Sequence, residues 1–259
     1  MSEVLSIESA GYCYIKGVFR YSAGVAALPG YEIRRCRFQK PIPVKAGFAA
    51  IEAHLKNLGR PINAFCACEL RSPEPFTMET FDIFNRDYLG ILERWGIMHE
   101  GNTPIARSNV CPEVHKPGVP SFYAFSYTVP APSAAKSCVI SGGAEAPEDK
   151  DNINDYIVRP GDQSPAGMRE KARYVLAEME RRMAALDFNW GDLTGTHLYT
   201  VYDIFSFLKE EIAERGAIPA GLTWHYARPP VDIVDYEMDV RCVWNEHVIA
   251  YNTLSRKEI

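Results

Sequence analysis

The stretch PIARSNV, residues 104–110, decides the fold because it has a counterpart in IPAGLTW, residues 218–224. The two segments align at an offset of 114 residues, and the same offset places FYAFSYTV, residues 122–129, over YEMDVRCV, residues 236–243. Two separate strand-like segments therefore agree without a gap. An internal repeat outranks other sequence signals, because a prediction that overlooks it gets the whole fold wrong. We interpret the chain as two related halves in tandem.

Each half has the same order of predicted elements. In the first half, apolar residues at helical spacing predict helices over residues 47–59 and 76–97. In the second half they predict helices over residues 164–187 and 203–216, and strand-like segments lie between the helices in both halves. The Pro/Ala/Ser stretch 129–137 is typical of a linker.

This order, β-β-α-β-α-β, favours an α+β fold with one domain in residues 1–130 and a second in residues 131–259. In each domain we expect a mostly antiparallel sheet that carries two α-helices on one face. The other face of the sheet must be buried against the other half or another subunit.

Composition bounds the function classes. The 259 residues are 47% hydrophobic with a net charge of -5, and the basic residues are dispersed, which argues against a nucleic-acid partner. No run of about 18 apolar residues predicts a membrane span. The seven cysteines are an odd number and most lie in apolar runs, which disfavours a disulfide framework. We predict a cytoplasmic protein that binds a small molecule.

Two clusters could suggest a metal, and both give weak signals. Cys66 and Cys68 share a strand face but lack a second ligand pair at metal spacing. His197 and His225 could approach Glu237 in a metal-hydrolase arrangement, yet two separated histidines and a carboxylate are common by chance. We predict no metal and no cofactor.

The second half resembles the RidA family, also called YjgF, of enamine and imine deaminases. The resemblance rests on the order of CVISGGAEAP, a long helix, THLYTVYDIF and IPAGLTWHYARPPVDIVDYEMDVRCV, and on FNRDY and PIARSNV in the first half. It implies two RidA-like, chorismate-mutase-like domains in tandem, the first degenerate, as in deaminases of the 2-aminomuconate type. Family members are typically single-domain trimers with ligand sites in the clefts between subunits.

The resemblance also assigns candidate site residues. The family's arginine for the substrate carboxylate matches Arg107, where the second half has Gly221. The family's water-holding glutamate matches Glu237, where the first half has Tyr123. Each half therefore keeps what the other has lost, and we expect Arg107 and Glu237 to share one cleft.

Three further matches complete the predicted site. The turn whose backbone faces the ligand matches Ser141 and Gly142, with Gly24 at the corresponding place in the first half. A family asparagine matches Asn85 in FNRDY. We assign substrate binding to Arg107, Ser141, Gly142, Asn85 and Gly24, and catalysis to Glu237 and Arg107.

The residue types suit this chemistry. A guanidinium binds a carboxylate through two parallel hydrogen bonds and stays charged. A buried glutamate with a raised pKa can move protons and orient water. The expected reaction is hydrolytic deamination of an enamine or imine carboxylic acid, such as 2-aminomuconate or its semialdehyde, with release of ammonia.

Two other functions stay open at this point. One is a chorismatase-like hydrolase, which would also use an arginine and a glutamate. The other is a small-molecule-binding protein without catalysis. In either case we expect a homo-oligomer and favour a trimer, because three two-domain chains would make two complete three-fold rings.

Overall fold

The computed structural model describes residues 3–148 and 153–251, and within them the strands form two sheets. One sheet has six strands in the order β11 (Ala227–Arg228), β6 (Ala106–Pro112), β5 (Phe65–Arg71), β7 (Ser121–Pro130), β4 (Tyr31–Pro43) and β13 (Asn245–Ile249). The other has seven in the order β1 (Val4–Ile7), β2 (Tyr12–Ile15), β3 (Gly24–Ala27), β8 (Cys138–Ala144), β12 (Glu237–Cys242), β9 (Gly195–Tyr199) and β10 (Leu222–His225).

The predicted repeat is visible in the strand order. The run β4-β7-β5-β6 corresponds to β8-β12-β9-β10, and in both runs the last pair is parallel while the other pairs are antiparallel. The α+β tandem fold predicted from the sequence is confirmed.

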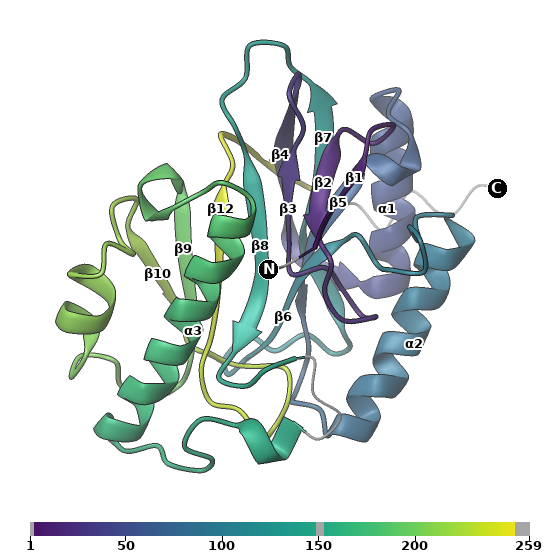
Figure 1. The fold of residues 1–259 in the computed structure, drawn as a ribbon. Helices are drawn as coiled ribbons and strands as arrows, with labels where there is room; N and C mark the ends of the chain where they lie inside the picture. Colours follow the sequence, from purple (N-terminus) through teal and green to yellow (C-terminus); the bar gives the residue numbers. More distant parts are fainter. Residues whose placement is uncertain (1–2, 149–152, 252–259) are drawn as a thin grey trace.

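Helices cover the outer faces of the two sheets. The helices α1 (Val44–Asn57) and α2 (Met78–Arg94) lie together on one side of the view in Figure 1, and α3 (Pro165–Ala185) lies on the other side of β8, β3 and β7. Short 3-10 segments occur at Ile62–Ala64, Ile153–Tyr156 and Trp190–Asp192.

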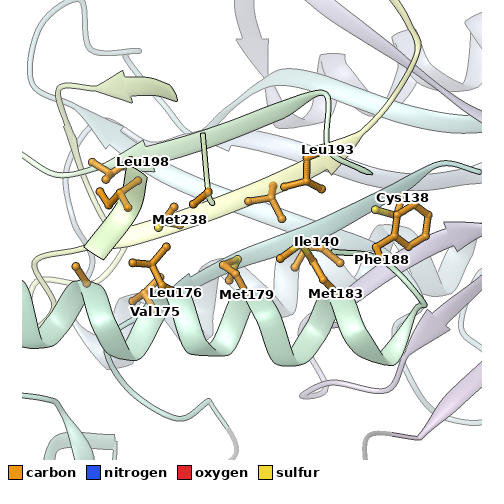
Figure 2. Packing of buried hydrophobic residues seen from close by; sticks show 14 of the residues in the cluster. Cys138, Ile140, Val175, Leu176, Met179, Met183, Phe188, Leu193, Leu198 and Met238 are labelled. Carbon is orange, nitrogen blue, oxygen red and sulfur yellow. The ribbon is translucent and has the colours of Figure 1, made fainter. Parts of the chain in front are cut away.

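Capping fixes the start of α3. The Ser164 side chain accepts a hydrogen bond from the Gly167 N–H at 3.1 Å, and Pro165 occupies the first helical position, where its missing N–H costs nothing. From there, Val175, Leu176, Met179 and Met183 of α3 point at Ile140 and Met238 of the sheet (Figure 2). This packing holds β8 and β12 in place.

The second helix of the second half is shorter than predicted. In place of a helix over residues 203–216, the described residues contain a π-helical segment, Leu208–Ala213. The Asp203 side chain accepts a hydrogen bond from the Phe205 N–H at 2.8 Å, which favours a local turn over the start of a helix.

The two halves exchange strands. β3 of the first half pairs with β8 of the second, and β13 from the C-terminal region pairs with β4 in the first. The boundary predicted between residues 130 and 131 stays a prediction, and strand pairing runs across it.

The inner faces of the two sheets bury each other. Buried residues from both sheets, including Tyr12, Val25, Cys66 and Ala106, form one apolar cluster between them. Beside it, the Glu69 carboxylate accepts hydrogen bonds from Arg35 at 2.6 and 2.8 Å and from Arg241 at 2.9 Å. The other half therefore supplies the cover that each sheet needs.

None of the helices in the described ranges combines the length and the apolar character needed to cross a membrane.

Candidate active site

A cavity between the two halves contains both Arg107 and Glu237 on its wall. The first half contributes Arg107 from β6 and Phe81 from α2, and the second contributes Gly142 from β8 and Glu237 from β12. The rest of the wall is largely apolar, with Val231 and Val234 among its residues. Arg107 from the first half and Glu237 from the second half therefore line the same cavity.

The Arg107 guanidinium is buried and held in one orientation. Its Nη2 donates to Asn85 Oδ1 at 2.7 Å, and its Cζ lies 4.9 Å from the ring centres of both Tyr21 and Tyr88. Its Nη1 is buried without a hydrogen-bond partner among the described residues. A buried, unpaired N–H of a charged group is costly, so this nitrogen is a candidate donor to a bound anion.

Ser141 fixes the backbone of Arg107. The Arg107 N–H donates to Ser141 Oγ at 3.0 Å, and the Ser141 hydroxyl donates to the Ser22 carbonyl at 2.6 Å. In return, the Gly142 N–H donates to Ser108 Oγ at 3.2 Å. These bonds join β6 to β8, so the first-half arginine keeps a fixed position relative to the second-half glutamate.

Glu237 lies against the backbone of Gly142. A Cβ at position 142 would stand only 2.1 Å from Glu237 Oε1, so glycine is the residue that leaves room for the carboxyl group. Burial raises the pKa of Glu237 well above its usual range, and the nearby carboxylates of Asp239 and Glu148 raise it further, against Arg71 and Arg182. The neutral acid is therefore favoured, which suits proton donation.

Arg182 of α3 supports the same part of β8. Its Nη1 donates to the Ser141 carbonyl at 3.2 Å, and its Nη2 lies 3.2 Å from Glu148 Oε1. Glu148 is itself on the cavity wall. Arg182 therefore ties the helix to the strand that carries Ser141 and to a second cavity carboxylate.

The remaining predicted residues take different positions. Asn85 lies fully buried on α2 and orients Arg107. Ser141 and Gly142 lie within β8, where the register with β12 shifts, and not in a turn. The Ser141 N–H donates to the Ala23 carbonyl at 3.2 Å and does not face a ligand. Gly24 pairs with Ile140 in the sheet and is absent from the cavity wall described above.

Sequence reasoning missed several polar residues of this cavity, among them Asn109, Arg20 and Glu148. Asn109 follows Arg107 by two residues on the same strand, so the period of a strand could have found it. Arg20 comes from the loop between β2 and β3, for which no periodic signal exists.

A second cleft, which we call the opposite cleft, contains the first-half counterpart of Glu237. It is lined by Tyr123, which stands where the second half has Glu237, and by Arg35, Arg37, His197 and His225. His197 Nδ1 lies 3.0 Å from His225 Nε2, away from Glu237's cavity. Within residues 3–148 and 153–251, no group of three or more His, Cys, Asp or Glu side chains is placed to hold a metal ion.

Known proteins resemble this chain along most of its length. A model of the family described as 2-aminomuconate deaminase CnbZ matches residues 4–247. A 2-amino-5-chloromuconate deaminase of Comamonas testosteroni is 48% identical over 251 residues, which are 96% of this chain and 100% of that protein.

Solved structures match parts of the chain. A putative endoribonuclease of Thermotoga maritima matches with a TM-score of 0.33 and 18% identity over 42% of this chain and 80% of its own. The YjgF gene product of E. coli matches with a TM-score of 0.30 and 18% identity over 41% of this chain and 80% of its own.

The expectation of a tandem protein of the 2-aminomuconate deaminase type is confirmed by the family match, which extends through both halves. The chain belongs to the family of the 2-aminomuconate deaminase CnbZ.

Proposed function

We propose that this chain hydrolytically deaminates 2-aminomuconate or a close ring-cleavage relative of it and releases ammonia. The family match supports the reaction and the substrate class. The observation that carries the proposal at the level of residues is that Arg107 and Glu237, from different halves, line one cavity.

Arg107 is the proposed binding group for the carboxylate next to the carbon that bears nitrogen. Its free Nη1 can donate to one carboxylate oxygen, and Asn85 on Nη2 holds the plane of the guanidinium. The surrounding Tyr21 and Tyr88 rings exclude water, which strengthens this contact. Ser141 acts as a positioning residue through the Arg107 backbone.

Glu237 is the proposed acid and base. The neutral carboxyl gives its proton to a carbon of the conjugated chain, and the nitrogen lone pair forms a C=N bond to the carbon beside the Arg107-bound carboxylate. The Glu237 carboxylate then takes a proton from water as the water oxygen bonds to that carbon. A proton moves from the new hydroxyl to nitrogen, the C–N bond breaks, and ammonia and an oxo acid leave. Glu237 is again neutral, so the cycle is balanced.

The test compares two conservative variants by ammonia release from 2-aminomuconate. We expect Arg107→Lys to raise KM about 10-fold or more, because an ammonium cannot donate to Asn85 Oδ1 and to the substrate carboxylate in the two fixed directions of a guanidinium. We expect Glu237→Gln to lower kcat by about 100-fold or more, since an amide cannot transfer the proton.

Exposed residues of the same types supply the controls. Arg86→Lys on α2 and Glu52→Gln on α1 should keep wild-type kinetics. Wild-type kinetics in Arg107→Lys or Glu237→Gln would remove the role assigned to that residue, and absence of ammonia release by the wild-type protein would overturn the proposed reaction.

Location and assembly follow from the same proposal. A catabolic deaminase of ring-cleavage products would work in the cytoplasm, where such intermediates arise. The homotrimer remains our preferred oligomer. Sedimentation velocity tests it, and a monomeric mass would contradict it.

A further inference from the structure

A second arginine, Arg20, lies on the wall of the same cavity as Arg107. Its side chain is 14% exposed, and its Nε is buried without a hydrogen-bond partner among the described residues. Its Cζ lies 5.5 Å from the centre of the Phe81 ring, and the Arg107 Cζ lies 5.8 Å from the same centre. The two guanidinium groups therefore lie beside one aromatic ring, within reach of a single short ligand.

The unpaired polar atoms of this cavity have one property in common: they are donors. Arg107 Nη1, Arg20 Nε and Asn109 Nδ2 are all buried and lack partners among the described residues. Asn109 is oriented by Ser72, whose hydroxyl donates to Asn109 Oδ1 at 3.0 Å, so its amide NH₂ group is the end left free. Several unpaired donors around an apolar wall call for a ligand with several acceptor oxygens.

Arg20 is also held in place. Its Nη1 donates to Asp82 Oδ1 on α2 at 2.9 Å, and the Phe19 ring lies 5.2 Å from its Cζ. Asp82 is 43% exposed, so water screens its charge and the guanidinium keeps much of its attraction for an anion. An arginine that only made a surface ion pair would not need to bury its Nε at a cavity wall.

We propose that Arg20 binds the second carboxylate of a dicarboxylate substrate, at the end of the chain away from the nitrogen, so that the cavity selects molecules with a carboxylate at both ends. This inference rests on the proposed function, in which Arg107 holds the first carboxylate. It restricts the substrate class to conjugated amino diacids and disfavours amino acids whose other end is an aldehyde or a methyl group.

The test uses two stable ligands that share a chain. The trans,trans isomer of muconate and sorbate have the same six-carbon conjugated chain, and they differ only in a terminal carboxylate or methyl group. Calorimetry should show wild-type protein binding muconate about 10- to 100-fold more tightly than sorbate, because only muconate makes the charge-assisted contact with Arg20. In Arg20→Gln this ratio should fall to about one.

Two further variants make the result specific. Arg107→Gln should weaken the binding of both ligands, because both carry the first carboxylate. Arg86→Gln makes the same loss of charge at an exposed position of α2, and it should leave the ratio as in wild type. Thermal melting of each variant shows whether it is folded, and Arg20→Lys, which keeps the charge but not the fork, should give an intermediate ratio.

An equal affinity of the wild-type protein for both ligands would overturn the inference, and so would an unchanged ratio in Arg20→Gln. With 2-aminomuconate, Arg20→Gln should raise KM by a larger factor than it lowers kcat. Failure of the two proposals can be told apart: a wild-type protein that prefers muconate but releases no ammonia would refute the reaction alone. Ammonia release without preference for the diacid would refute the role of Arg20 alone.

Discussion

The contact between Gly142 and Glu237 gives the sharpest mutational prediction. In Gly142→Ala, the new Cβ would stand 2.1 Å from Glu237 Oε1, whereas ordinary van der Waals contact begins at 3.4 Å. The Ser108 Cα would lie 3.3 Å from the same Cβ, which is also closer than ordinary contact. The carboxyl group must therefore move by about 1 Å, and a displacement of about 1 Å at a reacting group costs about 100-fold in rate.

The assay is kcat for ammonia release at saturating 2-aminomuconate. We expect a loss of about 100-fold in Gly142→Ala, together with a destabilisation of about 1–3 kcal/mol from overpacking in urea unfolding. Gly90→Ala on α2 is the matched control, because its Cβ would meet nothing closer than Arg94 Nη1 at 3.6 Å. That variant should keep wild-type kcat and gain roughly 0.5–1 kcal/mol in unfolding free energy.

A double variant isolates the cause. If Gly142→Ala acts by displacing Glu237, then adding it to Glu237→Gln should cost little further activity, since residues in contact are not additive. A folded Gly142→Ala protein with kcat within about threefold of wild type would contradict this prediction, because catalysis would then tolerate the displacement of the Glu237 carboxyl group.

Three more predictions concern pH and stability. The value of kcat/KM should fall as pH rises through the raised pKa of Glu237, because the neutral acid donates the proton, and Glu237→Gln should lose this descending limb. Ser141→Ala removes the acceptor of the Arg107 N–H and should lower the unfolding free energy by about 1–3 kcal/mol; an unchanged urea midpoint would contradict this. Burial lowers the pKa of His197 to about 3, and the positive charge of Arg241 is the second cause. Burial also lowers the pKa of His225 to about 4, and there the second cause is the charge of Arg71. The folded protein binds these protons less tightly than the unfolded chain, so stability should fall as pH drops from 6.5 towards 4, by about 1–2 kcal/mol for each histidine at pH 5. Urea unfolding at pH 7 and pH 5 measures this loss, which His197→Gln should reduce.

The internal repeat was the main basis on which the fold could be predicted from the sequence. Residues 122–129 and 236–243 have similar sequences at one offset and form corresponding strands, β7 and β12. The similarity predicts the strands because each strand must bury one face in the same way. The helices over residues 47–59, 76–97 and 164–187 were also predictable, since their apolar stripes face a sheet.

The exchange of strands could not be predicted. Alternation tells which face of β3 is buried but not which strand lies beside it, and sequence proximity favours a partner in the same half. The same holds for β13, whose pairing with β4 joins segments about 210 residues apart.

For the candidate site, the family pattern led to one cavity with Arg107 and Glu237 on its wall, but their roles there stay predictions. The pattern did not indicate Arg20, because a loop residue reaches a cavity only through the tertiary path of the chain. It also placed a turn at Ser141 and Gly142, where small residues instead mark a shift of register beside a close side chain.

The most direct test of a site shared between the halves is a crystal structure with bound trans,trans-muconate. We expect one carboxylate on Arg107 Nη1, the other near Arg20, and the Glu237 carboxyl group in contact with the carbon chain between them. Muconate bound in the opposite cleft beside Tyr123, with the Arg107 cavity empty, would contradict it.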